Sequence, residues 1–174
     1  MIGISKLYCG TVEPSDALRY GRDSSRLPSH LLQFSKDKKP VVVWNVTRRC
    51  NLKCVHCYAH AKDMAFEDEL TTEEGKRVID DLAAFGAPVI LFSGGEPLLQ
   101  SIPLVEILSL CRQSGINTVI ETCGAAPWSA FETVIPYTDR FYFDLKAHED
   151  ALHQRLTGSP LKGIRENARK AKRV

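Results

Sequence analysis

The sequence predicts an α/β fold in which helices cover a parallel sheet of about four strands. Two observations lead to this prediction. From residue 41 onward, short apolar runs rich in β-branched residues alternate with longer stretches of helical pattern. Each apolar run is followed by an unusual polar cluster, and the carboxyl ends of parallel strands are where such folds place their chemistry. The polar clusters should therefore meet at one edge of the sheet.

The first two strand–helix units are the clearest. VVVWNVT (41–47) is a continuous apolar run that predicts a buried strand. LTTEEGKRVIDDLAAFG (70–86) predicts a helix, because its start has the T-x-x-E spacing of a capping box and its last glycine suits a helix end. PVILFS (88–93) predicts the second strand, and IPLVEILSLCRQSG (102–115) predicts an amphipathic helix that a glycine again terminates.

The alternation continues to the end of the chain. INTVIET (116–122) predicts the third strand. PWSAFETVIPY (127–137) predicts a helix, since its first proline suits an initial helical turn. RFYFDLK (140–146) predicts the fourth strand, and the segments 149–158 and 161–174 predict two further helices.

The composition sets limits on the kind of protein. Residues 1–40 are polar and interrupted by prolines, which predicts an irregular leader ahead of a core at 41–174. No segment has the ~18 consecutive apolar residues of a membrane span, and the start does not resemble a secretory signal. The net charge of +2 argues neither for nor against an anionic partner, and the basic C-terminal segment is typical of a solvated helix face more than of a nucleic-acid tail. We therefore expect a cytoplasmic protein without a membrane or nucleic-acid partner.

Three cysteines follow the first predicted strand. Cys50, Cys54 and Cys57 have C-x3-C-x2-C spacing, and a cysteine cluster in a reducing compartment indicates metal binding or catalysis. Three thiolates can hold three irons of a [4Fe–4S] cluster and leave the fourth iron open to a small molecule. The same three cysteines with His60 could form a Cys₃His zinc site. A non-enzymatic zinc or electron-carrying module is thus the alternative to a catalytic cluster.

The second predicted strand ends in SGGEP. With CNLKCVHC after the first strand, this pair of motifs resembles the radical S-adenosylmethionine (SAM) superfamily. The resemblance implies a partial (βα) barrel, C-terminally incomplete because the fifth and sixth strands are missing. It implies two cofactors, a [4Fe–4S] cluster on Cys50, Cys54 and Cys57, and SAM, whose amino and carboxylate groups chelate the open iron. One electron then splits SAM, and the resulting 5′-deoxyadenosyl radical abstracts a hydrogen from the substrate.

The resemblance also implies a set of SAM-binding residues. The glycines of GGEP permit close backbone approach, and Glu96 is expected to accept a hydrogen bond from the amino group of SAM. His56, at the aromatic position of the cysteine motif, is expected beside the adenine, although a solvated loop histidine is the simpler alternative. Side chains two apart in a strand point the same way, so Asp144 and Lys146 should share the site unless they form a surface ion pair. The expected SAM-binding residues are His56, Gly94, Gly95, Glu96, Pro97, Glu121, Thr122, Asp144 and Lys146.

The remaining cysteines are interpreted as packing residues. Cys123, in ETCG after the third strand, is expected to be a small buried residue near the site and not a fourth ligand. Cys9 and Cys111 are expected to pack in apolar surroundings.

Two groups of relatives within the superfamily divide the chain. Residues 1–63 resemble haem-biosynthesis enzymes, namely didecarboxysirohaem deacetylase and NirJ-like enzymes, and the sequence from FSGGEPLLQ onward resembles the activases of glycyl radical enzymes. The first resemblance implies an oxidoreductase with a tetrapyrrole substrate. The alternative is an activating enzyme that generates a glycyl radical on a partner protein. Either function implies an electron donor such as flavodoxin or ferredoxin.

Overall fold

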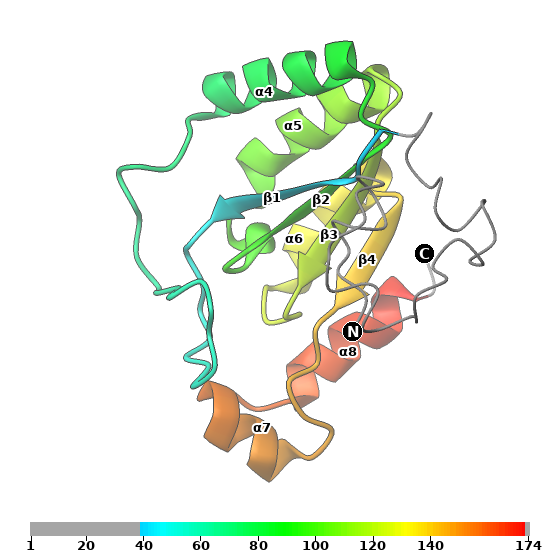
Figure 1. Cartoon of the computed structure of the whole chain (residues 1–174). Helices are drawn as coiled ribbons and strands as arrows, with labels where there is room; N and C mark the ends of the chain where they lie inside the picture. The colour runs from blue at the N-terminus through cyan, green and yellow to red at the C-terminus, as the bar shows by residue number, and fades with distance from the viewer. Residues whose placement is uncertain (1–38, 173–174) are drawn as a thin grey trace, which may run out of the picture. The chain divides into compact units, whose positions relative to one another are not determined.

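Four parallel strands, in the order β1-β2-β3-β4, form the sheet of the computed structural model, which describes residues 39–172 (Figure 1). The predicted α/β class and the number of strands are confirmed. The leader predicted for residues 1–40 lies outside the described residues apart from its last two, and Cys9 lies outside them too. The strands are β1 (Val42–Thr47), β2 (Val89–Gly94), β3 (Asn117–Thr122) and β4 (Arg140–Phe143).

The helices follow the predicted order with two differences. The predicted helix 127–137 ends as an α-helix at Val134 and continues as a 3₁₀ turn, because Pro136 has no N–H to donate into an α-helical hydrogen bond. A short 3₁₀ turn, η2, also precedes the second helix and was not predicted. The elements are α4 (Thr72–Phe85), η2 (Pro97–Gln100), α5 (Ser101–Gln113), α6 (Trp128–Val134), η3 (Ile135–Tyr137), α7 (Asp150–Thr157) and α8 (Lys162–Ala171).

The predicted capping box at the start of α4 is present. The Thr71 hydroxyl accepts a hydrogen bond from the Glu74 backbone N–H at 3.3 Å, and a carboxylate oxygen of Glu74 accepts one from the Thr71 N–H at 2.9 Å. Gly86 ends the helix with φ = 82°, in the left-handed region that favours glycine. Local sequence signals therefore set both ends of this helix.

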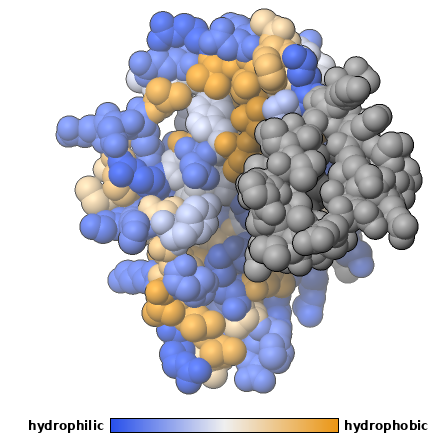
Figure 2. Space-filling model, viewed as in Figure 1, coloured by the Kyte–Doolittle hydropathy of each residue, from blue (hydrophilic) through white to orange (hydrophobic). Residues whose placement is uncertain are grey.

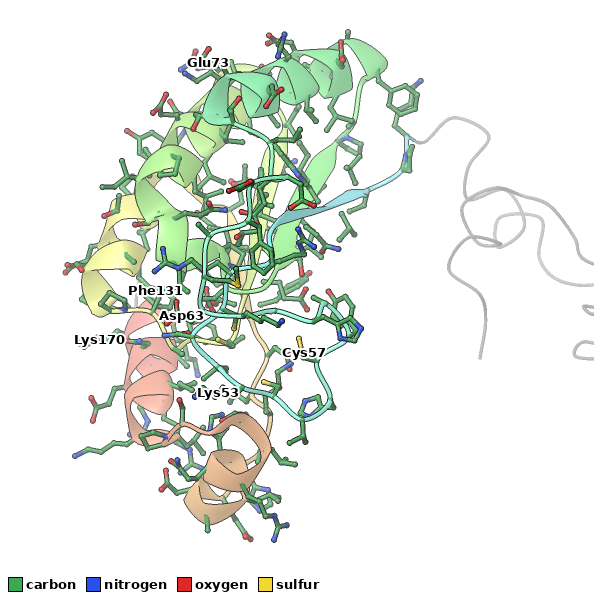
Figure 3. The ribbon with its side chains drawn as sticks, turned by 90° about the vertical axis from the view of Figure 1, so that its left-hand side faces the viewer. Lys53, Cys57, Asp63, Glu73, Phe131 and Lys170 are labelled. Atoms are coloured by element: carbon green, nitrogen blue, oxygen red, sulfur yellow. The ribbon has the colours of Figure 1, made fainter. Side chains whose placement is uncertain are left out.

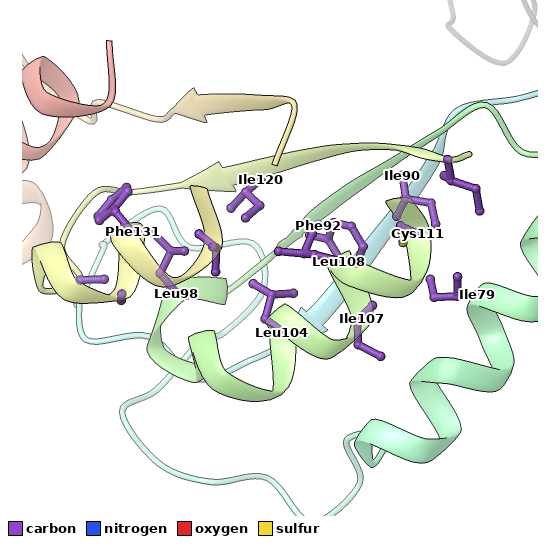
Figure 4. Packing of buried hydrophobic residues seen from close by; sticks show 14 residues of the cluster. Ile79, Ile90, Phe92, Leu98, Leu104, Ile107, Leu108, Cys111, Ile120 and Phe131 are labelled. Atoms are coloured by element: carbon purple, nitrogen blue, oxygen red, sulfur yellow. The ribbon is translucent and has the colours of Figure 1, made fainter. Parts of the chain in front are cut away.

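The main core lies between the sheet and the helices α4, α5 and α6, which cover one face of the sheet (Figures 1 and 4). Ile90, Phe92 and Ile120 from the strands and Leu108 from α5 are fully buried in it. Hydrophilic residues cover the outer side of α4 (Figure 2), as expected of an amphipathic helix. The opposite face of the sheet keeps large side chains exposed: Tyr142 retains 53% of its accessible surface.

Within residues 39–172, the helices are all too short or too polar to cross a membrane. The sheet instead serves as a platform, since its four carboxyl ends point toward the loops that carry the predicted site residues.

Replacing Gly163 by alanine should stabilise the protein by about 0.5 kcal/mol, because glycine is a poor helix former. Gly163 lies in α8, and a Cβ added there meets no atom within 4 Å. The midpoint of urea unfolding measures the gain. The matched control is Gly124→Ala, which should destabilise, because Gly124 has φ = 77° and its added Cβ would lie 3.0 Å from Ile164. A Gly163→Ala midpoint below that of the parent chain would contradict the expectation.

Candidate functional site

A cavity of about 190 Å³ opens at the carboxyl edge of the sheet. Its walls come from the loop after β1, from the ends of β2 and β3, and from the segment after β4, as the sequence predicts. All the predicted site residues line it except Glu96 and Pro97. The predicted residues in its wall are Cys50, Cys54, His56, Cys57, Gly94, Gly95, Glu121, Thr122, Asp144 and Lys146.

The three cysteines lie on one irregular segment, residues 48–61, called here the cysteine loop. Backbone N–H groups point at two of its sulfurs: Leu52 donates to Cys50 Sγ and Ala61 donates to Cys57 Sγ, both at 3.4 Å. Such N–H···S contacts stabilise negative charge on a thiolate, and hydrogen bonds to the sulfurs tune iron–sulfur clusters. Figure 3 shows Cys57 within this loop.

The chemistry of the cysteines fits a cluster held by thiolates. The Cys123 thiol contacts Cys50 and lowers the pKa of Cys50 to about 7, with the help of the Leu52 N–H and against the opposing effect of burial. Burial raises the pKa of Cys54. The positive charge of Lys146 acts in the opposite direction but only partly offsets this effect on the pKa. A bound iron ion would supply the positive charge that a buried thiolate needs. These residues therefore fit a [4Fe–4S] cluster on three thiolates.

The zinc alternative finds less support in the geometry. His60 is exposed and does not line the cavity. Among residues 39–172, no three His, Cys, Asp or Glu side chains converge on the position of a single metal ion. A cubane does not require such convergence, since each thiolate binds a separate iron.

Glu96 does not reach the cavity. Its carboxylate is fully buried and accepts hydrogen bonds from the backbone N–H groups of Leu98 (3.1 Å) and Cys123 (2.9 Å) and from the Thr122 hydroxyl (2.8 Å). Burial raises the pKa of Glu96, although these donors act in the opposite direction. The position departs from the expected contact with SAM: Glu96 instead ties the turn after β2 to the end of β3. Pro97, also buried, begins η2 and does not line the cavity.

The glycines of GGEP do permit a close backbone approach, as predicted. The group they approach is the protein's own backbone at Thr47 and Arg49. Gly94 has φ = 120°, and a Cβ there would lie 2.3 Å from the Thr47 carbonyl oxygen. Gly95 has no positive φ, yet its Cβ would lie 2.3 Å from the Arg49 carbonyl oxygen. Gly95 N–H donates to Thr47 O at 2.7 Å, and Glu96 N–H to Arg49 O at 2.8 Å. Glycine is therefore needed where the turn packs on the start of the cysteine loop.

The strand argument for Asp144 and Lys146 is wrong, because β4 ends at Phe143 and both residues lie in the segment that follows. They are brought together all the same: Lys146 Nζ donates to Asp144 Oδ2, and both line the cavity. Burial lowers the pKa of Lys146, but the ion pair with Asp144 outweighs it and the net pKa is raised. Lys146 is thus a cation at the cavity wall, half-buried and paired with the exposed carboxylate of Asp144.

Sequence reasoning missed a polar row on the face of the sheet opposite the helices α4, α5 and α6. Ser93 Oγ donates to Glu121 Oε2 at 2.6 Å, Asn45 pairs with Ser93 in register, and Tyr142 pairs with Glu121. The row borders the cavity through Ser93 and Glu121. Counting by two from Leu91 in LFSGG would have placed Ser93 on this face.

A second cavity, of about 390 Å³, adjoins the first and shares Tyr58, Ala59 and Gly94 with it. Its polar wall comes from Glu69, which accepts from the Thr47 hydroxyl at 3.0 Å, and from Asp68. The site therefore has room beyond the first cavity for a larger ligand.

The other cysteines behave as predicted where they are described. Cys111 is fully buried on α5, and burial raises its pKa to about 12, so it is a packing residue. Cys123 is buried beside Cys50, with its Sγ 2.8 Å from Glu96 Oε2. The contact with Cys50, burial and the nearby Glu96 carboxylate all raise the pKa of Cys123, which favours a neutral thiol over a fourth thiolate ligand.

Replacing Glu96 by glutamine should destabilise the protein by about 2 kcal/mol. Each carboxylate oxygen accepts a buried backbone N–H, so whichever oxygen becomes an NH₂ group leaves one N–H without an acceptor. Chemical denaturation measures the loss. The matched control is Glu106→Gln on the exposed side of α5, which should change stability by less than about 0.5 kcal/mol. Equal stability of the two variants would refute the role given to the Glu96 network.

Two curated proteins with similar sequences are enzymes of the kinds that the sequence motifs resemble. A relative from Methanosarcina barkeri (strain Fusaro / DSM 804), Fe-coproporphyrin III synthase, is 75% identical over 124 residues, which cover 71% of this chain and 31% of that protein. The 4-hydroxyphenylacetate decarboxylase activating enzyme of Clostridioides difficile (strain 630) is 34% identical over 133 residues, which cover 73% of this chain and 41% of that protein. The chain thus spans less than half the length of both relatives.

The fold has a solved counterpart. The structure of Streptococcus suis SuiB bound to S-adenosylmethionine matches with a TM-score of 0.62 at 19% identity, over 75% of this chain and 30% of that one. The family model of the radical SAM superfamily matches residues 44–174, which include the cysteine loop and all four carboxyl strand ends. This family uses a [4Fe–4S] cluster and SAM, the cofactors that the three-cysteine cavity fits. The chain belongs to the radical SAM superfamily.

Proposed function

We propose that this chain is the SAM-cleaving part of a radical SAM enzyme that acts on an iron tetrapyrrole in haem biosynthesis. The observation that carries the proposal is a cavity in which the three cysteines after β1 meet polar residues from the ends of β2 and β3 and from the segment after β4. The choice of substrate is supported by the 75% identity with the relative named Fe-coproporphyrin III synthase. Residues 41–174 would form the core that binds the cofactors, and the leader 1–40 would precede it.

Cys50, Cys54 and Cys57 would hold the cluster, and the N–H groups of Leu52 and Ala61 would stabilise charge on two of the sulfurs. When bound, the cluster supplies the electron that splits SAM into methionine and the radical that abstracts a substrate hydrogen. Cys123 would keep its proton and leave one iron free for SAM.

Side chains in the wall of the cavity would match the polar groups of SAM. Lys146 would pair with the SAM carboxylate, and Asp144 and Glu121 would accept hydrogen bonds from the amino group and the ribose hydroxyls. His56, exposed at the mouth, would lie against the adenine. Gly94, Gly95 and Thr122 would shape the floor, with Glu96 and Pro97 beneath it. An electron donor of the flavodoxin or ferredoxin class would act in the reducing cytoplasm.

The test is anaerobic reconstitution of the chain with iron and sulfide, followed by incubation with SAM and a reductant. We expect 5′-deoxyadenosine to form, and we expect a didecarboxysirohaem substrate to stimulate its formation. Stimulation by a glycyl radical enzyme alone would replace the substrate proposal with the activase alternative. A colourless protein without iron, or one that does not cleave SAM, would overturn the proposed function.

A further inference from the structure

The C-terminal end of α7 contacts the cysteine loop on both sides of its middle cysteine. The Lys53 backbone N–H donates to the Thr157 carbonyl oxygen at 2.8 Å, and the Val55 N–H donates to the Leu156 carbonyl oxygen at 2.9 Å. Cys54 lies between these two donors. Figure 1 shows the loop after β1 descending to α7, and Figure 3 shows Lys53 near that end of the loop.

The contact gives hydrogen-bond partners to backbone groups of both α7 and the cysteine loop. The last carbonyl groups of a helix have no partner within the helix, and Thr157 and Leu156 belong to the last turn of α7. The loop around Cys54 lies outside helices and strands, so its N–H groups need acceptors from elsewhere. Gly158 then ends the helix with φ = 75°, which turns the chain away and leaves the two carbonyls facing the loop.

Two buried side chains fix this end of α7. His153 keeps only 1% of its surface exposed, and its Nδ1 lies 2.7 Å from the Ser159 carbonyl oxygen, a contact that requires a proton on Nδ1. The fully buried Thr157 hydroxyl donates to the His153 carbonyl oxygen at 2.8 Å and accepts from the Ser159 N–H at 3.3 Å. Within residues 39–172, neither residue lines a cavity of the site.

The burial of these side chains does not serve the main core. None of the residues in the main hydrophobic cluster of the described chain, nor of those packed against it, comes from α7. His153 and Thr157 are thus buried outside the main core, where α7 turns at Ser159 and its last carbonyl groups meet the cysteine loop.

We propose that α7 is a positioning element for Cys54, and that His153 and Thr157 are positioning residues that act through the Leu156 and Thr157 carbonyl groups. The network holds the cysteine loop in place before any metal binds. This inference rests on the proposed function only for its statement that the positioned thiol is a cluster ligand.

The test uses two matched pairs of variants in the full chain. His153→Leu and Thr157→Val remove the polar groups, while His153→Asn and Thr157→Ser keep a donor or a hydroxyl in a similar place. Hydrogen–deuterium exchange of a peptide covering residues 51–58 is measured in the apoprotein, and release of iron to a chelator is measured after reconstitution. His153→Leu and Thr157→Val should each speed exchange of that peptide about fivefold or more, since a lost buried hydrogen bond costs about 1 kcal/mol. Iron release should accelerate in the same two variants, and the conservative partners should stay near the parent chain.

A core variant separates positioning from general stability. Ile79→Val should lower global stability by about 1 kcal/mol and leave exchange of the loop peptide unchanged. The proposal is overturned if loop exchange in His153→Leu and Thr157→Val equals that of the parent, or if Ile79→Val speeds it equally. If His153→Leu does not fold by circular dichroism, the Thr157 pair decides. A parent chain that binds no iron would overturn the proposed function alone, because the exchange measurement on the apoprotein still tests the positioning of the loop.

Discussion

Cys54→Ala should abolish iron binding. The middle cysteine would supply one of three thiolates, and its loss would leave one iron of the cubane without a protein ligand in addition to the iron reserved for SAM. After anaerobic reconstitution, the iron content should fall from about four per chain to near zero, with loss of the brown colour and of the low-temperature EPR signal of the reduced cluster. Cys111→Ala is the control, because that thiol is buried in the main core and should leave the iron content intact.

Cys123→Ser completes this test. Cys123 lies beside Cys50 and is the described cysteine that could be mistaken for a fourth ligand. The structure directs its thiol to Glu96 and Cys50, so the serine variant should keep its cluster. Loss of iron in Cys123→Ser, or retention of full iron content in Cys54→Ala, would contradict the assignment of three ligands and an open iron.

Gly95→Ala should destabilise the protein by about 3–5 kcal/mol and prevent cluster assembly. The new Cβ would lie 2.3 Å from the Arg49 carbonyl oxygen and 2.8 Å from its carbon, and both are backbone atoms that no side-chain rotation can move. Relief requires the cysteine loop to move away from the turn after β2, which breaks the hydrogen bond from Glu96 N–H to Arg49 O.

Thermal unfolding and iron content measure the two effects of Gly95→Ala. The matched control is Gly115→Ala, where the added Cβ meets nothing within 4 Å and only the positive φ of 73° is strained, at about 1 kcal/mol. A Gly95→Ala protein as stable as Gly115→Ala would show that the loop and the turn do not pack as closely as the structure places them.

The sequence predicted the sheet and most of the site because both depend on local patterns. Apolar runs such as VVVWNVT and PVILFS are short and rich in β-branched residues, which favours buried strands, and the carboxyl ends of parallel strands share an edge. The positions of Cys50 and Lys146 in one cavity follow from that edge, although they are far apart in the chain.

Contacts that depend on tertiary structure leave no local signal in the sequence. A glutamate in a turn could face either a ligand or the protein interior, and only the neighbouring end of β3 shows that Glu96 faces inward. Asp144 and Lys146 were placed on a strand because nothing in RFYFDLK marks where strand pairing stops. The contact of α7 with the cysteine loop is made by backbone groups, which carry no signature in the sequence.

The hydrogen bonds from Gly95 and Glu96 to the carbonyls of Thr47 and Arg49 make the turn after β2 and the start of the cysteine loop a single preorganised unit. The conformational entropy of this segment is lost when the chain folds and not when the cofactors arrive. Cofactor loading should then involve little rearrangement of the backbone there, because the cost of ordering this segment is already met in the folded apoprotein.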